Sequence, residues 1–190
     1  MIVYLRGFNS SPESHKAQFM KVWMEQHGLD SKLIRPGLAH WPNEAIGMIE
    51  TELGRHANEE LTFLGSSVGG FYATWLAKKY DMRAVLINPA IMPHLGLRSF
   101  LGRQKNLYNS ETYELTEVHL AQLEGLLVPA ITPERYLLPV ETGDEVIDYR
   151  EALAKYRGSR QMVVQGGNHT LRSFPEHIPM VLEFSGLNPG

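Results

Sequence analysis

Short apolar runs alternate with longer helical patterns along most of the chain, and this alternation is the feature that most restricts its fold. Six runs have the length and apolar content of strands: residues 2–6, 31–35, 61–65, 84–88, 135–141 and 160–166. Continuous stretches such as VLI and MVV are typical of strands covered on both faces, as in a parallel sheet. Between the runs, apolar residues recur three and four positions apart, which indicates helices. The alternation therefore predicts an α/β, doubly wound fold.

Residues 89–134 interrupt this alternation. They contain four prolines and no clear strand, and one helix is expected within residues 111–127. An insertion of this length is usually functional or disordered. Leucines at positions 115, 120, 123, 126 and 127 favour a packed helical lid. We therefore expect a single domain over residues 1–190, with a lid insertion at 89–134.

The composition excludes several classes of protein. The 190 residues carry a formal net charge of −3 and no cysteine. Disulfides, thiolate metal sites and a cysteine nucleophile are therefore excluded, and nothing indicates a nucleic-acid partner. No apolar run approaches the length of a membrane span, and the N-terminus lacks the features of a signal peptide. We expect a cytoplasmic protein; the oligomeric state stays open.

The segment Gly65-Ser66-Ser67-Val68-Gly69 matches the pattern Gly-x-Ser-x-Gly. It lies between a predicted strand and a predicted helix, as a nucleophile elbow requires. In such a turn the serine hydroxyl stands above the sheet edge, at the N-terminus of the following helix, where developing negative charge is favoured. The alternative interpretation is a glycine-rich turn with a serine helix cap. Ser67 is the candidate nucleophile.

Two further residues follow later strands at the same sheet edge. Asp144 comes after the fifth predicted strand and His169 after the sixth, in a loop of sequence GGNH. A serine hydroxyl needs a base, and the base needs an orienting acid, in the chain order serine, acid, histidine. Each residue has an alternative interpretation: Asp144 as the cap of a helix near Val146, and His169 as a solvated loop histidine. The three together predict a Ser67–His169–Asp144 triad.

The loop after the first strand, Arg6 to Ser10, is expected to complete the site. The backbone N–H groups of Phe8 and Val68 are the candidate oxyanion donors. The alternative for this loop is a turn that leads into a capped helix, and both interpretations can hold together. For Arg6 we favour pairing with a nearby carboxylate over binding of an acidic substrate group.

Several segments together resemble one known family. YLRGFNSSPESHKA, GSSVGGFYATWLA, INPA, TGDEVIDYREA and GGNH are similar to the YqiA-like esterases, a small bacterial branch of the α/β-hydrolase superfamily. The resemblance runs from the first strand to the last helix and is weakest in residues 91–133. It implies esterase or thioesterase activity without a metal or an organic cofactor, with Ser67, Asp144 and His169 in the catalytic roles. It also implies six strands in the order 2-1-3-4-5-6.

The predicted function is therefore hydrolysis of a small-molecule acyl ester or thioester through an acyl-enzyme. An acyltransferase with the same triad and a non-catalytic binding protein on the same fold are the alternatives. A Rossmann-type nucleotide site is disfavoured, because GSSVGG lacks the Gly-x-Gly-x-x-Gly spacing and follows the third strand. For the substrate, Met92, Leu95, Leu97, Phe100 and Leu101 are candidates for an acyl pocket or for core. Arg98, Arg103 and Lys105 are candidates for an anion-binding cluster or for a solvated face.

Overall fold

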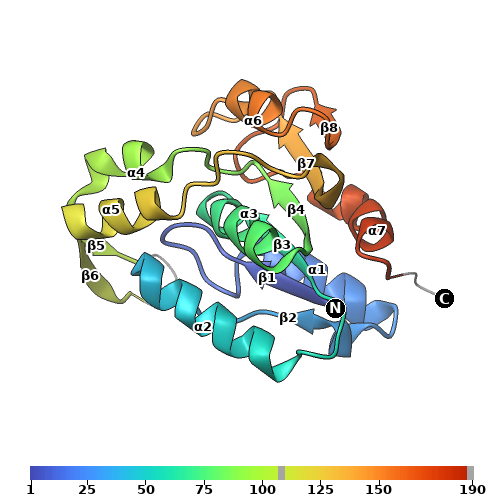
Figure 1. The fold of residues 1–190 in the computed structure, drawn as a ribbon. Coiled ribbons are helices and arrows are strands. Elements are labelled where there is room, and N and C mark those ends of the chain that lie inside the picture. Colours follow the sequence, from blue (N-terminus) through green and yellow to red (C-terminus); the bar gives the residue numbers. More distant parts are fainter. Residues whose placement is uncertain (107–109, 188–190) are drawn as a thin grey trace.

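The computed structural model describes residues 1–106 and 110–187 and contains one central six-stranded sheet (Figure 1). Its strands lie in the order β2-β1-β3-β4-β7-β8, and every neighbouring pair is parallel. This order confirms the predicted 2-1-3-4-5-6 topology. The strands are β1 (Ile2–Leu5), β2 (Leu33–Ile34), β3 (Thr62–Ser66), β4 (Arg83–Ile87), β7 (Tyr136–Glu141) and β8 (Arg160–Val164).

Helices cover both faces of the sheet. The longer ones are α1 (His15–Gln26), α2 (Pro42–Arg55), α3 (Val68–Tyr80), α5 (Glu117–Gly125), α6 (Tyr149–Lys155) and α7 (Phe174–Phe184). The helix α4 (Pro93–Gly96) and the 3-10 turns η1 (Asp30–Lys32), η2 (Arg98–Phe100) and η3 (Pro133–Arg135) are short.

The alternating side chains of the strands divide the core into two layers. Val3, Phe63 and Leu86 pack with α2 and α3 on one face, whereas Ile2 and Leu64 pack with α1 and α7 on the other. All five side chains are completely buried. Burial on both faces accounts for the continuous apolar runs of these strands.

The segment between β4 and β7 differs from the expectation. It contains a two-stranded antiparallel sheet, β5 (Gly102–Lys105) with β6 (Thr112–Leu115), so the prediction that residues 89–134 lack strands is wrong. The helix expected within residues 111–127 is the shorter α5, because residues 112–115 form β6. These four residues alternate between exposed and buried, so the hairpin buries one face only and lacks the apolar run that marks a central strand.

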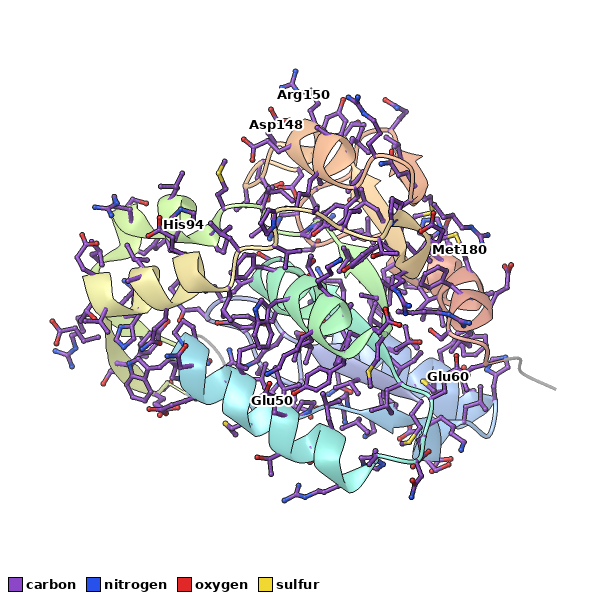
Figure 2. All side chains as sticks on the ribbon, viewed as in Figure 1. Glu50, Glu60, His94, Asp148, Arg150 and Met180 are labelled. Carbon is purple, nitrogen blue, oxygen red and sulfur yellow. The ribbon has the colours of Figure 1, made fainter. Side chains whose placement is uncertain are left out.

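Polar contacts at the surface link or cap several helices, and Figure 2 labels three of the residues involved, Glu50, Asp148 and Arg150. Glu50 on α2 accepts hydrogen bonds from Lys79 and Tyr80 at the end of α3. Asp148 and Arg150 lie together at the start of α6, where Asp148 caps the helix by accepting from the Arg150 N–H at 3.0 Å. No helix within the described residues is long and apolar enough to span a bilayer.

Candidate active site

Ser67 occupies the turn between β3 and α3 in a strained backbone conformation. Its φ is +56° and its ψ is −121°, a region that residues other than glycine seldom adopt. The carbonyl of Ser67 accepts hydrogen bonds from Gly70, Phe71 and Ala90, and its N–H donates to Ile87. These bonds hold the turn, so the surrounding backbone stabilises the strained residue.

Glycines allow this turn to pack against its neighbours. A Cβ added to Gly65 would overlap the backbone of Gly69, and one added to Gly69 would overlap the carbonyl of Leu5. A Cβ on Gly7 would lie 3.2 Å from the Ser67 Cβ. The loop after β1 therefore lies directly against Ser67, as the predicted placement of the oxyanion loop requires.

The two predicted oxyanion donors belong to these neighbouring segments. Phe8 follows Gly7, and Val68 is the first residue of α3, directly after Ser67. Both residues line a small cavity of about 30 Å³. Ser67 does not line this cavity, but Phe8 also lines the pocket that contains Ser67, so one donor shares that pocket and the other follows Ser67 in the chain.

The β5–β6 hairpin supports the same loop. Tyr113 on β6 donates a hydrogen bond of 2.6 Å to the Asn9 carboxamide, and Asn9 has a φ of +51°. Phe8 packs edge to face against Phe100, with 5.8 Å between the ring centroids. Residues that precede α5 in the chain thus fix a loop about 100 positions earlier.

His169 and Asp144 form a close pair. The Nδ1 atom of His169 lies 2.8 Å from Oδ2 of Asp144, and only 1% of the Asp144 side chain is exposed. The other carboxylate oxygen of Asp144 accepts from the N–H groups of Val146 and Ile147. Burial raises the pKa of Asp144, but the hydrogen bonds from His169, Ile147 and Val146 together outweigh it and hold this pKa below its ordinary value.

A single pocket joins the serine to the histidine. It has a volume of about 350 Å³, and its walls include Ser67, His169, the loop after β1 and the start of α1. The structure therefore brings Ser67, His169 and Asp144 to one sheet edge, as their positions after parallel strands predict. Nδ1 of His169 contacts the Asp144 carboxylate, so Nε2 is the ring nitrogen that does not contact Asp144.

Two buried residues that sequence reasoning missed hold the loop of His169. The Glu141 carboxylate at the end of β7 accepts from the Asn168 N–H at 2.6 Å and from the Ser173 hydroxyl at 2.7 Å. Asn88, after β4, donates to the His169 carbonyl at 3.2 Å and accepts from the Glu141 N–H. A polar residue at the carboxyl end of a buried strand is the sequence signal that identifies both.

Arg6 does not have the carboxylate partner that we expected. Its guanidinium donates to the carbonyls of Gly7 and Leu38, and no carboxylate forms an ion pair with it among residues 1–106 and 110–187. Only 8% of the residue is exposed, and this burial lowers the pKa of Arg6. The expected carboxylate pairing is therefore wrong, and backbone carbonyls stabilise the charge instead.

The candidate acyl-pocket residues within residues 89–134 do not line the pocket that contains Ser67. Leu97 packs partly buried against the core, whereas Met92, Leu95, Phe100 and Leu101 are exposed. Arg98 forms a surface ion pair with Glu117, and Arg103 and Lys105 are exposed on β5. In the part of the chain that the structure describes, no group of three or more His, Asp or Glu residues is placed to bind a metal ion.

The strand order and the strained serine turn after β3 define the α/β-hydrolase fold. At the level of sequence, the chain belongs to the family described as "Uncharacterised protein family (UPF0227)", whose profile matches residues 1–186. The UPF0227 protein YcfP of Escherichia coli O9:H4 (strain HS) is 22% identical over 191 residues, which cover 98% of this chain and 99% of that protein. These matches confirm the family resemblance noted from the sequence.

Solved structures with the same fold are more distant in sequence. Mouse α/β hydrolase domain-containing protein 10 is similar with a TM-score of 0.71 at 13% identity, covering 96% of this chain and 87% of that one. The monoacylglycerol lipase of Paleococcus ferrophilus has a TM-score of 0.66 at 14% identity, covering 97% of this chain and 93% of that one. At this identity the likeness concerns the fold.

Proposed function

We propose that the protein is a serine hydrolase that cleaves acyl esters or acyl thioesters. The observation that carries this proposal is the 2.8 Å contact of Asp144 with His169, which lines the same pocket as the strained Ser67. A buried acid that orients a histidine in the same pocket as a turn serine is the arrangement that activates a hydroxyl nucleophile. The lipase from P. ferrophilus that shares the fold is named for ester hydrolysis, which agrees with this reaction class.

In the proposed reaction, Ser67 attacks the carbonyl carbon of the ester or thioester. His169 accepts the hydroxyl proton through Nε2 and then donates it to the leaving alcohol or thiol. Asp144 holds the Nδ1–H of His169 and stabilises the imidazolium that forms. Water then repeats the sequence on the acyl-enzyme, which releases the free acid and restores Ser67.

Negative charge on the tetrahedral intermediate is stabilised, in this proposal, by the N–H groups of Phe8 and Val68. Val68 begins a helix of 13 residues, so the partial positive charge of the helix N-terminus adds to its N–H. The close approach of Gly7 to Ser67 supports the assignment of Phe8, because it places the loop beside the nucleophile. Donors fixed in this way need no reorganisation as charge develops.

Covalent labelling with a fluorophosphonate tests the proposal. We expect one adduct on the purified protein, located on Ser67 by peptide mapping and lost in His169→Ala, since the hydroxyl then lacks its base. Ser67→Ala should lower ester turnover by about 10³- to 10⁶-fold. The products with an ester substrate should be the free acid and the alcohol, which separates hydrolysis from acyl transfer.

The matched controls are a histidine and a serine outside the pocket. His56→Ala, at the end of α2 beside Glu52 and Glu59, and Ser159→Ala, before β8, should label as the unchanged protein does. Labelling of a serine other than Ser67, or turnover that survives Ser67→Ala, would contradict the mechanism.

A further inference from the structure

The pocket that contains Ser67 is lined mainly by polar side chains. Beyond the reacting residues its walls come from Ser10, Ser14, His15, Lys16 and Thr170, with Tyr4 and Phe8 as its aromatic members. Within the described residues, no aliphatic side chain and no carboxylate lines it. Most of the surface that these residues expose to the pocket is nevertheless carbon, so a polar substrate group is indicated by the charged Lys16 and not by the lining as a whole.

Lys16 places a positive charge in the wall of this pocket. Its ammonium donates to the Thr170 carbonyl at 2.9 Å, which fixes the charge one residue from His169. An ammonium carries three N–H donors, and this bond uses one of them. The remaining donors can bind a ligand without loss of the contact to Thr170.

Among the described residues that line the pocket, Lys16 is the only lysine or arginine, and no carboxylate lines the pocket beside it. α1 begins there, at His15, and its first turn contains no acidic residue. The preceding carboxylate, Glu13, pairs with Arg35 at 3.3 Å. Asp144 and Glu141 interact with Lys16 through space, but neither lines the pocket, since their oxygens bind the backbone and side chains of the His169 loop.

From these observations we propose that the ester or thioester cleaved at Ser67 carries an anionic oxygen group, in its acyl or its alcohol half, which binds Lys16. This inference rests on the proposed hydrolase function and specifies its substrate class. Lys16 is then a specificity-determining residue: its ammonium pairs with the anion while Ser67 attacks the carbonyl in the same pocket.

Matched pairs of an anionic and a neutral ester test the proposal. For the acyl half, the pair is a 4-nitrophenyl hemisuccinate and the corresponding methyl succinate ester. For the alcohol half, it is 4-acetoxybenzoate and 4-acetoxybenzamide. The ratio of kcat/KM for the anionic ester to that for the neutral ester divides out any general loss of activity. We expect a ratio of about 10 or more for one of the pairs, in line with a hydrogen bond to a charged group.

Substitutions at position 16 should change this ratio. Lys16→Met should reduce it about tenfold, whereas Lys16→Arg should largely retain it, because arginine keeps the charge. Lys21→Met is the matched control: this lysine lies on the same helix, pairs with Glu25 at the surface and should leave the ratio unchanged. A Lys16 that only supports the backbone of Thr170 would alter both esters of a pair equally.

The pH dependence gives a second readout. Burial lowers the pKa of Lys16 to about 8, against the opposing effect of Asp144 and Glu141. The ammonium is therefore charged below pH 8 and loses its proton above it, so the ratio should fall between pH 7 and pH 9.5. It should stay high in Lys16→Arg and low in Lys16→Met over that range. His169 and His15 also lie at the pocket, and Lys16→Met retains both of them, so the comparison with this variant isolates the contribution of Lys16.

The outcomes separate this inference from the function on which it rests. If Ser67 takes up the fluorophosphonate and the neutral esters are cleaved, but both ratios are near one and insensitive to Lys16→Met, the anionic substrate is overturned and the hydrolase stands. If Ser67 does not react and neither pair is cleaved, both are overturned. A ratio that falls in Lys16→Met and not in Lys21→Met supports the proposal.

Discussion

Asp144 uses its two carboxylate oxygens for different contacts. One accepts from the N–H groups of Val146 and Ile147, as a helix-capping residue does, and the other contacts His169. From the sequence, capping and catalysis were alternative interpretations of this residue. The structure shows that the two sets of contacts coexist, and that the backbone bonds orient the carboxylate toward the histidine.

Gly69 gives the sharpest prediction at the scale of one residue. Its position on the turn admits no side chain, because an added Cβ would overlap the Leu5 carbonyl and lie 2.6 Å from the Arg6 carbonyl. Backbone atoms cannot move aside as a flexible side chain can. We expect Gly69→Ala to lower the free energy of unfolding by at least about 3 kcal/mol, as measured by urea denaturation.

The control for this prediction is an unhindered glycine. Nothing lies within 4 Å of a Cβ added to Gly47, which is exposed in the middle of α2. Gly47→Ala should therefore be neutral or stabilising by up to about 1 kcal/mol, because alanine favours the helix. Equal effects of the two substitutions would show that the crowding at Gly69 has no energetic consequence.

At the scale of elements, the site consists of loops that buried polar side chains hold in place through hydrogen bonds. Glu141 binds the loop of His169 from the end of β7, and Asn88 binds it from the end of β4. The loop after β1 is held in the same way by the β5–β6 hairpin through Tyr113. Single side chains on or next to the strands thus fix the two loops of the site.

Glu141→Gln should weaken this support while preserving the size of the side chain. The glutamine amide keeps one acceptor oxygen, but its NH₂ group faces either the Asn168 N–H or the Ser173 hydroxyl, which both donate to Glu141. The charge-assisted character of these two hydrogen bonds is also lost. We expect a loss of about 1–3 kcal/mol in stability. We also expect a larger decrease in kcat than increase in KM, because the change displaces His169 rather than the substrate contacts. Thermal denaturation and steady-state kinetics measure the two effects.

Glu183→Gln serves as the comparison, because Glu183 forms only an exposed ion pair with Arg160 at 3.3 Å. Exposed pairs contribute little, so this variant should match the unchanged protein in both stability and kcat. If Glu141→Gln behaved in the same way, the loop of His169 would not depend on the buried carboxylate.

Features of the fold and the site that depend on neighbouring residues could be predicted from the sequence, whereas those that depend on residues far apart in the chain could not. The central strands follow from local runs, and Ser67, Asp144 and His169 follow from local motifs after those runs. The β5–β6 hairpin was missed because its strands have one packed face and a polar first strand, GRQK. The local sequence identifies Glu141 only as the end of a strand, because its partners lie 27 and 32 positions later.

At the scale of the whole molecule, the sheet separates two apolar layers that must form together. Leu64 lies in the layer with α1 and α7, while its neighbour Phe63 faces α2 and α3, and both are completely buried. Leu64→Ala should therefore cost about 2–5 kcal/mol, through lost burial and a cavity. This loss corresponds to a decrease in Tm of about 4–20 °C for a domain of this size.

Leu95→Ala provides the contrast, because this leucine is 54% exposed on α4. Its removal should change Tm by no more than about 2 °C, in line with surface substitutions. Calorimetry on the two variants shows whether the two apolar layers unfold together or separately. A small shift for Leu64→Ala with an early partial transition would indicate that the layer of α1 and α7 unfolds separately.

The unequal edges of the central sheet bear on how the protein avoids self-association. β2 provides only Leu33 and Ile34, which is too little backbone for an incoming strand of another chain to pair with stably. The opposite edge, β8, has five residues but begins with the exposed, charged Arg160. The Arg160 guanidinium pairs with Glu183 at 3.3 Å, so charged side chains lie at this margin. Short length at one margin and charge at the other thus limit edge-to-edge aggregation, although no further strand among residues 1–106 and 110–187 covers either margin.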